Sequence, residues 1–364
     1  MITPTTSVTR LVPLSAIDES LRRAWSDLAA AAVEPNPYFE PEVLLPAAQH
    51  LAGGAALALL TVQRDGELLW AMPVMRERHR RMPLQADSTW RHPYRYLGTP
   101  LAREQGLPEA ADAALKALGG GWLVLEDLPL DGPVATALRA AALGRGAVWR
   151  EYDIWERPYV HRRAEATYLE ETLSARSAKT LRRQRRNLER DLGGTVVTAQ
   201  APVDAEQVTA FLDCEAAGWK GQAGTALASD PRHATFFREV CARLDAVGRV
   251  QLWHLCAGPT VVARQCHLRS GDIVFHFKTA YDEGWHRASP GVLLELDVLS
   301  AFHADLALAH LDPCTAPTPS PSPSARLYPD QRRMGTALIG LTAAGRLAAK
   351  ATPAAARAWR AVRR

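Results

Sequence analysis

The first half of the chain alternates between helix-like and strand-like patterns of apolar residues. Apolar runs over 56–63 and 67–75 flank a turn at 64–66, whose Asp-Gly pair is typical of a β-hairpin. A further apolar run at 121–128 has the length and composition of a buried strand. Helical spacing of apolar residues predicts these helices in the first half: 16–33, 43–52, 108–118 and 131–143.

The second half repeats the same order of patterns. Apolar runs over 250–256 and 260–268 flank a turn at 257–259, and another strand is predicted over 272–278. The predicted helices of this half are 205–217, 231–247 and 290–310. Each half therefore reads as helix, helix, hairpin, strand and helix, which predicts a mixed α/β fold used twice. An ancient duplication would explain this, although the two halves share little sequence, so the question stays open.

A polar and aromatic segment near 150–163 divides the two halves. The predicted domains are 1–155 and 156–314. The Pro/Ser-rich segment that follows, 315–330, predicts an exposed loop or linker because it cannot bury enough surface to order tightly. Beyond it, 331–364 contains basic but no acidic residues and predicts a basic tail with a helix interrupted at Pro353.

The composition is that of an ordinary folded protein. The chain has 364 residues, of which 47% are hydrophobic and 23% charged, a length that favours two domains. A net charge of +4 is too small to indicate nucleic-acid binding by itself, but it suits a partner that carries phosphates. No apolar run reaches the ~18 residues of a membrane-spanning helix, and the N-terminus has no signal-peptide pattern. We therefore expect a cytoplasmic protein.

The cysteines indicate free thiols in a reducing compartment. There are 5 of them, an odd number, and no two are spaced as Cys-x-x-Cys. Cys266 and His267 are adjacent in a predicted strand, where neighbouring side chains point to opposite faces. We therefore predict no metal site.

The start of the last predicted helix has the features of an anion site. Ser289 stands at the N-cap position and Pro290 at the first helical position, both preferred there. The open amides that follow, at Gly291 and Val292, would bind a phosphate or another anion. A plain helix start without a ligand is the alternative.

The strand before this helix contains residues suited to acyl transfer. In a regular strand, Val274, His276 and Lys278 would share one face. A lysine in a cleft would stabilise the negative oxygen that develops when an amine attacks an acyl group, and the histidine would accept the proton of that amine. Alternatively, the lysine reaches solvent from the strand end and the histidine is a core residue.

A glycine-rich segment between two predicted helices is typical of a binding loop. It holds Trp219, Lys220, Gly221 and Thr225. The tryptophan would form a pocket wall and the lysine would bind a carboxylate or phosphate. An ordered connector is the alternative.

The segment 179–190 predicts an amphipathic basic helix. Its basic residues fall on one side of the helix and its leucines on the other. The basic residues are Lys179, Arg182, Arg183, Arg186 and Arg190. A solvated face is the default reading; contact with RNA phosphates or an acidic lipid surface is the alternative.

Several segments together resemble one family. The most specific are GWKGQAGTAL at 218–227, FKTAYD at 277–282 and SPG at 289–291. They resemble bacterial acyltransferases of the GNAT superfamily first associated with cellulose biosynthesis, which are akin to Fem-type peptidyltransferases. The resemblance implies tandem GNAT-like domains, the N-terminal one degenerate and the second holding the acyl donor. It also implies that a Phe-Lys pair, here Phe277 and Lys278, contacts the reacting carbonyl.

The leading hypothesis is an N-acyltransferase that moves an acyl group, acetyl in the first instance, from coenzyme A to an amine. The acceptor would be a small molecule or a sugar or peptide precursor. Lys278 and the Phe277 main chain would stabilise the oxyanion, and Tyr281 would protonate the leaving group. His276 or Asp282 would be the base. The phosphates would lie at Ser289, Pro290, Gly291 and Val292.

Two other functions remain open at this point. The usual coenzyme A signature, Gln/Arg-x-x-Gly-x-Gly/Ala, is absent, and the resemblance to Fem-type proteins together with the basic helix points to aminoacyl-tRNA as the alternative donor. A non-catalytic scaffold of polysaccharide machinery is the third reading. In that case the basic tail, 331–364, would make a peripheral membrane contact.

Overall fold

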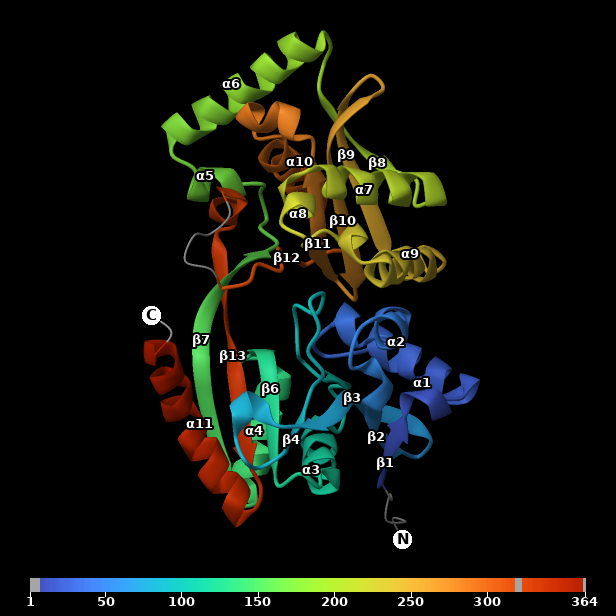
Figure 1. Cartoon of the computed structure of the whole chain (residues 1–364), viewed down its shortest axis with the longest axis vertical. Helices are drawn as coiled ribbons and strands as arrows, with labels where there is room; N and C mark the ends of the chain where they lie inside the picture. Colours follow the sequence, from blue (N-terminus) through green and yellow to red (C-terminus); the bar gives the residue numbers. More distant parts are fainter. Residues whose placement is uncertain (1–6, 318–322, 363–364) are drawn as a thin grey trace. The chain divides into compact units, whose positions relative to one another are not determined.

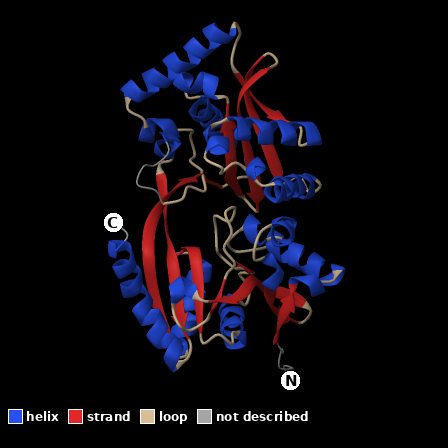
Figure 2. Ribbon diagram, in the orientation of Figure 1, coloured by secondary structure: helices blue, strands red, loops and turns tan. Residues whose placement is uncertain are grey.

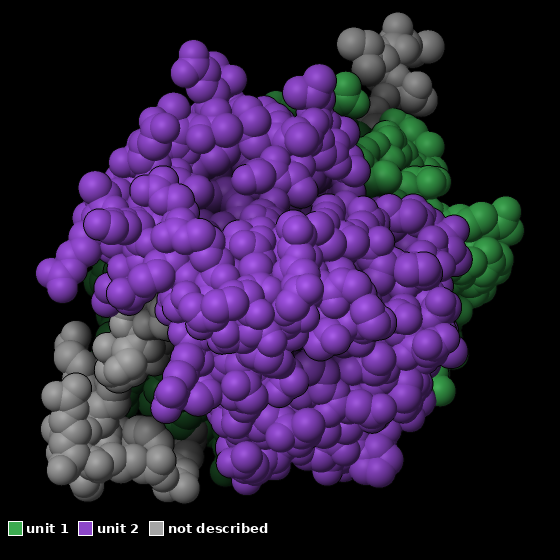
Figure 3. All heavy atoms as spheres, turned by 90° about the horizontal axis from the view of Figure 1, so that it is seen from above, with its two compact units in different colours: residues 1–156, 333–364 green, residues 157–332 purple. Residues whose placement is uncertain are grey.

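The computed structural model describes residues 7–317 and 323–362. The chain forms two compact units (Figure 3). Unit 1 comprises residues up to 156 together with those from 333 onward, and unit 2 comprises residues 157–332. The C-terminal segment therefore belongs to the first unit.

Unit 1 is a sheet with helices on its faces (Figure 1). Its helices are α1 (Glu19–Ala30), α2 (Pro41–His50), α3 (Leu107–Ala117), α4 (Pro133–Gly144) and α11 (Ala343–Val362). Its strands are β1 (Ser7–Pro13), β2 (Ala58–Arg64), β3 (Glu67–Glu77), β4 (Ala86–Ser88), β5 (Leu101–Ala102), β6 (Trp122–Pro129), β7 (Val148–His161) and β13 (Asp330–Gly340). The sheet order is β1-β2-β3-β4-β6-β13-β7, and β5 pairs with β3.

Unit 2 has the same layered construction (Figure 2). Its helices are α5 (Tyr168–Thr172), α6 (Ala175–Leu192), α7 (Ala205–Ala217), α8 (Trp219–Gln222), α9 (Pro231–Asp245) and α10 (Pro290–Ala304), with the short 3-10 helices η6 (Glu283–Ala288) and η7 (Pro323–Leu327). Its strands are β8 (Val197–Ala201), β9 (Val250–Ala257), β10 (Thr260–Ser270), β11 (Ile273–Tyr281) and β12 (His310–Asp312). From β7 the order is β12-β11-β10-β9-β8.

The order of elements confirms the predicted mixed α/β fold used twice. Unit 1 runs β1, α1, α2, β2, β3, β4, α3, β6, and unit 2 runs β8, α7, α9, β9, β10, β11, α10, β12 apart from the short α8 and the 3-10 turns. In each unit the strand after the helix pairs in parallel with the strand before it, β6 with β4 and β12 with β11. The first hairpin turn is also as predicted: Asp65 and Gly66 both have positive φ, 53° and 84°, which suits a tight two-residue turn. That the first unit is degenerate stays a prediction.

The predictions for the segment between the two halves and for the end of the chain were partly wrong. The divider near 150–163 is largely the strand β7, and residues 330–340 form β13, which pairs with β6 in the sheet of unit 1. The basic segment is therefore not a free tail, and α11 continues through Pro353 without interruption. A strand this far along the chain gains its partner only on folding, because β6 is some 200 residues earlier in sequence.

The Pro/Ser-rich segment is also more ordered than predicted. Its residues 318–322 lie outside the described part of the chain, but residues 323–327 form η7. Leu327 at its end and Tyr328 directly after it are buried, at 1% and 7% exposure. The apolar and aromatic residues that end the segment provide the burial that its Pro/Ser part lacks.

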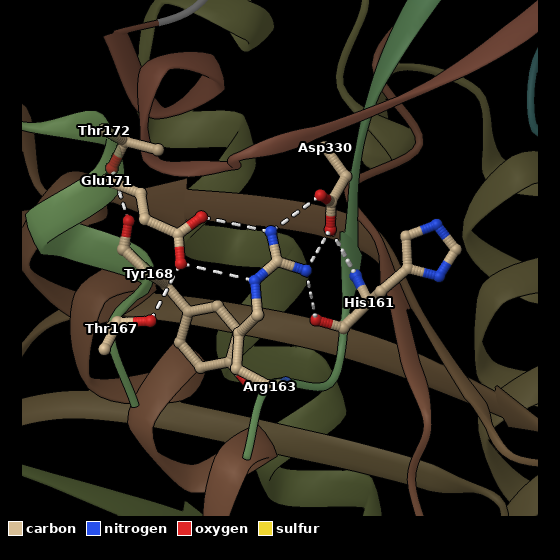
Figure 4. A network of polar contacts seen from close by, with 7 residues as sticks. All are labelled: His161, Arg163, Thr167, Tyr168, Glu171, Thr172 and Asp330. Atoms are coloured by element: carbon tan, nitrogen blue, oxygen red, sulfur yellow. Dashed lines mark hydrogen bonds and ion pairs between the residues drawn. The ribbon is translucent and has the colours of Figure 1, made fainter. Parts of the chain in front are cut away.

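A polar network in unit 2 fastens α5 to the end of β7 and the start of β13 (Figure 4). The Arg163 guanidinium donates to both carboxylate oxygens of Asp330, at 2.7 and 3.0 Å, and to those of Glu171, at 3.1 and 3.3 Å. The main-chain amide of His161 donates to Asp330 at 2.7 Å. The hydrogen bonds to Asp330 and Glu171 raise the pKa of Arg163. One cation therefore joins the end of β7 and α5 to the start of β13, which lies 167 residues further along the chain.

We expect Arg163→Met to lower the unfolding free energy of the full chain by about 1–2 kcal/mol, because two carboxylates lose their charged donor. The shift in Tm would be about 2–5 °C for a domain of this size. Thermal unfolding followed by circular dichroism measures it. The matched control is Arg176→Met, which removes an exposed arginine of α6 and should leave Tm unchanged. Equal Tm values for both variants would show that the network adds nothing to stability.

Candidate functional site

A β-bulge in β11 decides where the predicted catalytic residues point. His276 pairs with His267 of β10 and Lys278 pairs with Cys266, so Phe277 is the extra residue of the bulge. The His276 ring lies 3.0 Å from Glu295 of α10, whereas the Phe277 ring stacks on a phenylalanine of α9. Lys278 lies beside Glu215 of α7, on that same side. The prediction that His276 and Lys278 share one face is therefore wrong, because regular alternation does not survive an inserted residue.

A pocket lies between α7, α8 and the end of β11. Its lining residues are Cys214, Glu215, Gly218, Trp219, Lys220, Thr279, Ala280, Tyr281 and Glu283. Of the predicted site residues, Trp219, Lys220 and Tyr281 therefore line one pocket. The Trp219 side chain is half exposed, at 52%, and its main-chain amide donates to Glu283 at 2.5 Å. An exposed tryptophan over a polar floor is suited to cover a ligand.

Gly221 and Thr225 shape the loop and do not line this pocket. A Cβ on Gly221 would lie 1.8 Å from the carbonyl oxygen of Ala216, so only glycine lets α8 pack this closely on the end of α7. The main-chain amide of Thr225 donates to the Lys220 carbonyl at 2.8 Å. Both residues thus hold Lys220 in place, and their predicted contact with a substrate stays untested.

Two lysines share one buried carboxylate at the pocket floor. Lys220 Nζ donates to Glu215 Oε1 at 2.9 Å and to the Thr279 carbonyl at 2.6 Å. Lys278 Nζ lies 3.9 Å from the same Glu215 oxygen. The other Glu215 oxygen accepts the main-chain amide of Leu227 at 2.8 Å, and the Glu215 side chain is fully buried. The cluster therefore carries an excess positive charge whenever both lysines are protonated.

Burial lowers the pKa of Lys278, Glu215 partly offsets this and Lys220 adds to it, and the resulting pKa is about 8. The charged form of a buried, poorly hydrated lysine is stabilised by a nearby negative charge. The floor of the pocket is thus prepared to bind an anion or an oxygen that becomes negative during a reaction.

A second buried network lies on the opposite face, under α10. Glu295 accepts hydrogen bonds from the Tyr328 hydroxyl, from Gln265 Nε2 at 2.7 Å and from His276 Nδ1 at 3.0 Å. Burial alone would raise the pKa of Glu295, but His276 and the other donors lower it to about 2. The remaining nitrogen of His276, Nε2, lies 2.6 Å from the Thr279 hydroxyl. His276 is thus held at both ring nitrogens.

α10 begins at Pro290, as the sequence predicted, but Ser289 does not cap it with its hydroxyl. Ser289 has a φ of 52° and its side chain makes no capping hydrogen bond; the hydroxyl instead accepts Gln184 Nε2 of α6 at 3.1 Å. A Cβ at Gly291 would lie 3.5 Å from Thr279 Cγ2 and 3.7 Å from Tyr281 Cδ1. The first turn of α10 therefore packs directly on the end of β11.

The edge of β11 is open next to this helix start. In the described chain, β12 pairs only with Ile273–Phe275 of β11. The later part of the strand, from His276 to Tyr281, extends beyond β12 on that edge. An extended ligand with amide groups would pair with main chain of this kind.

Asp282 has a structural task in this arrangement. Its carboxylate accepts the Gly284 amide at 2.9 Å, and it caps η6. It does not line the pocket described above. The geometry therefore does not support Asp282 as the base. Nε2 of His276 is hydrogen-bonded to the Thr279 hydroxyl.

The basic helix α6 is amphipathic, as predicted. Leu188 is buried, and Leu181 and Leu192 pack against the same core cluster. Lys179, Arg182, Arg183, Arg186 and Arg190 are exposed. Arg185 pairs with Asp297 in the middle of α10 at 2.5 Å, and Gln184 Nε2 donates to the Ser289 hydroxyl at the start of that helix at 3.1 Å.

Residues 175–319 match the family model described as acetyltransferase (GNAT) domain. The chain is similar to a GNAT domain over these residues. The matched residues include the pocket, the bulged strand β11 and the start of α10. The finer resemblance, to acyltransferases associated with cellulose biosynthesis, stays a prediction.

Solved structures similar to this chain extend over both units. FemX has a TM-score of 0.60 at 9% identity and covers 88% of this chain and 96% of its own. The C-terminal domain of a putative lysylphosphatidylglycerol synthetase from Agrobacterium fabrum has a TM-score of 0.52 at 12% identity, covering 90% and 94%. A protein of unknown function from Bacteroides thetaiotaomicron has a TM-score of 0.54 at 10% identity, covering 92% and 100%. At such identities the likeness shows the fold alone. Comparison with curated proteins gives no match.

The described residues also bear on membrane spans and metal sites. In the part of the chain that the structure describes, no helix has the length and apolarity to span a bilayer. Within the same residues, no three histidine, cysteine, aspartate or glutamate side chains are grouped so as to hold a metal ion. The cytoplasmic location stays a prediction.

Sequence reasoning missed the carboxylates and their partners. Glu215, Gln265, Thr279, Glu295 and Tyr328 received no role, although each is at the centre of one of the two networks. Glu295 offered a signal, since it is an acid within the apolar run VLLELDVL. A charge in such a run is almost never fully buried unless it is paired.

Proposed function

We propose that the GNAT domain transfers an acyl group from a coenzyme A thioester to an amine. The observation that carries this proposal is the pair Lys220 and Lys278 around the buried Glu215, beside the open end of β11. The pair lies where a reacting carbonyl would meet the strand. The acceptor would be a small molecule or a sugar or peptide precursor.

The donor would lie along the open edge of β11. The pantetheine arm of coenzyme A contains two amides and would pair with the extended main chain after Phe275. Its phosphates would lie near Ser289, Pro290, Gly291 and Val292, at the first turn of α10, where helix amides favour negative charge. Gly291 has no side chain to keep a ligand away from this turn.

The transfer would be a direct attack by the amine on the thioester carbon. Lys278 and the Phe277 main chain would stabilise the oxyanion as the carbon–nitrogen bond forms. The carbon–sulfur bond then breaks, and Tyr281, which lines the pocket, would protonate the departing thiolate. Trp219 and Lys220 would bound the acceptor side of the pocket.

Acetyl-CoA at about one hundred times its dissociation constant is expected to raise the unfolding free energy by about 2–3 kcal/mol, because it binds only the folded state. Thermal unfolding with acetyl-CoA and longer acyl-CoAs measures this, with adenosine bisphosphate as the control for the nucleotide alone. Release of free thiol in the presence of an amine panel then tests transfer itself. Unchanged Tm with every thioester would reject coenzyme A as donor.

Aminoacyl-tRNA is the second candidate donor. The observation in its favour is the exposed basic face of α6, which has the charge to bind RNA phosphates and lies beside the start of α10. This donor predicts tRNA binding that weakens steeply with salt. Transfer from acetyl-CoA that is unaffected by nuclease treatment would reject it.

A further inference from the structure

Another cavity of unit 2 lies between the sheet and the last turns of α10, and its lining residues differ from those of the pocket around Lys220. It has a volume of about 150 Å³. A cavity of about this volume in another protein binds benzene. Most of its lining residues are apolar and come from β9, β11, α10 and the loop after α10: Trp253, Val274, Val298, Ala301, Phe302 and Leu308.

We propose that this cavity binds a small molecule made of one apolar ring with a hydroxyl group, the hydroxyl lying between His267 and Gln251. Both residues line the cavity from the sheet side, His267 on β10 and Gln251 on β9. The site goes beyond the proposed acyl transfer and requires neither its donor nor its acceptor.

His267 has a ring nitrogen that lacks a hydrogen bond. The residue lines the cavity and is 1% exposed, and its Nδ1 has no partner among the residues that the structure describes. The other nitrogen, Nε2, lies 3.1 Å from Gln265 Oε1, so Nδ1 is on the ring edge away from Gln265. A buried polar atom left without a hydrogen bond costs about 1–3 kcal/mol. A ligand that bonds to Nδ1 would remove this cost.

The neighbouring groups make Nδ1 an acceptor. Glu295 has a pKa of about 2, so it is ionised at neutral pH and can only accept hydrogen bonds. Gln265 therefore turns its Nε2 toward Glu295, at 2.7 Å, and its Oε1 toward His267. His267 Nε2 must then carry the hydrogen of that contact. Burial lowers the pKa of His267 to about 3, so the ring is neutral and Nδ1 carries no hydrogen.

Gln251 provides a donor beside this acceptor. It pairs directly with His267 across β9 and β10, and side chains of such pairs have Cβ atoms about 4.5–5.5 Å apart on one face of the sheet. Its Oε1 accepts Trp253 Nε1 at 3.4 Å, which leaves its Nε2 available as a donor. One hydroxyl can donate to His267 Nδ1 and accept from Gln251 Nε2 at the same time.

Water alone fills such a cavity poorly. A water molecule occupies about 30 Å³ in the liquid and needs two to four polar partners, whereas this cavity is larger and its walls are mainly apolar. Trp253 and Phe302 offer aromatic surface against which a ring packs well. Gln200 is exposed and the Asp305 side chain is 35% exposed, so these two residues form the entrance from solvent.

The test measures the affinities of phenol and toluene for the full chain by isothermal titration calorimetry. The two probes have nearly the same size, but only phenol has a hydroxyl. We expect the ratio of phenol affinity to toluene affinity to fall by about tenfold in His267→Phe, as for the loss of one buried hydrogen bond. Taking the ratio cancels the change in cavity shape. Gln251→Leu removes the donor and should lower the same ratio, which keeps the test valid if the phenylalanine variant does not fold.

A second pair of variants tests the place of binding. Ala301→Leu fills the cavity from α10 and should weaken both probes by at least about tenfold, because the lost apolar volume is comparable to the ring. The matched control is Ala304→Leu, an exposed position of the same helix, whose affinities should stay within about twofold of wild type. A crystal structure of the full chain grown with 4-bromophenol should show the bromine inside the cavity.

The site would be overturned if wild-type protein bound neither probe, if Ala301→Leu bound phenol as tightly as wild type, or if the crystal structure showed only ordered water there. An unchanged affinity ratio in both His267→Phe and Gln251→Leu would overturn the assignment of the hydroxyl. Because these measurements use no thioester, their failure leaves the proposed acyl transfer untouched, and the failure of acyl transfer leaves this site untouched.

Discussion

Replacing Glu295 with alanine is expected to lower the unfolding free energy by about 3–5 kcal/mol, because removing one partner of a buried charged network leaves the others unsatisfied. Glu295 is 1% exposed and accepts from Tyr328, Gln265 and His276. Each of these donors would lose its acceptor on Glu295. Urea unfolding of the full chain measures the loss, and Asp297→Ala on the same helix is the control. Asp297 forms a partly exposed pair with Arg185, so its loss should cost no more than about 1 kcal/mol.

The same residue predicts how stability changes in acid. The pKa of Glu295 is lowered from 4.5 to about 2 in the folded chain. Its contribution to stability is therefore complete above about pH 4.5, where the unfolded chain is also ionised, and is lost as the pH falls through about 2. Glu295→Gln removes this titration, so the stability gap between variant and wild type should narrow from pH 5 to pH 2. A gap that stays constant over this range would show that folding leaves the pKa of Glu295 unchanged, and a change of the opposite sign would show that folding raises it.

Elements with a strong local pattern were predictable from the sequence, and the elements around the site belong to this group. The hairpins, the strand that became β11 and the start of α10 at Pro290 all follow from alternation, turn residues and a proline at the first helical position. The buried face of α6 follows from its leucines. These features depend on neighbours in sequence, which a single chain displays.

The features that depend on distant neighbours were not predictable. The bulge at Phe277 arises from pairing with β10, and the sequence of β11 alone does not predict it. Tyr328 belongs to a segment that reads as a linker, yet it bonds to Glu295 some thirty residues away. The sequence of β13 likewise predicts part of a basic tail, whereas in the fold this segment is a strand that pairs with β6. Composition cannot show that a polar residue will find a buried partner from another segment.

The bulge places the side chains of His276 and Lys278 on opposite faces of β11, whereas a regular strand would carry both on one face. With regular alternation, these two side chains would lie next to each other on the same side of the sheet. The inserted Phe277 places the imidazole beside α10 and the ammonium beside α7. Thr279, immediately after Lys278, turns its hydroxyl to His276 on the α10 side and its main-chain carbonyl to Lys220 on the pocket side. The strand thus offers a cation on one face and a proton acceptor on the other at the same level.

Lys278→Ala is expected to reduce turnover by about 100-fold or more, because it removes a cation positioned for the oxyanion. Folding should survive the change, since Glu215 keeps Lys220 as its partner at 2.9 Å and the buried charge of Lys278 is itself poorly hydrated. Thiol release from acetyl-CoA with an amine acceptor measures turnover, and urea unfolding checks stability. Lys116→Ala, an exposed lysine of α3 in the other unit, is the control. Turnover equal to that of wild type would remove Lys278 from the site.

The pH dependence distinguishes a cation from a base at this position. The pKa of Lys278 is lowered from 10.5 to about 8, so the ammonium form predominates below pH 8 and is lost as the pH rises through 8. If the positive charge is what the reaction needs, wild-type turnover relative to Lys278→Arg should fall above pH 8, because arginine keeps its charge. Taking the ratio at each pH cancels the titration of the acceptor amine. A ratio that rises through pH 8 would instead show that neutral Lys278 acts as the base.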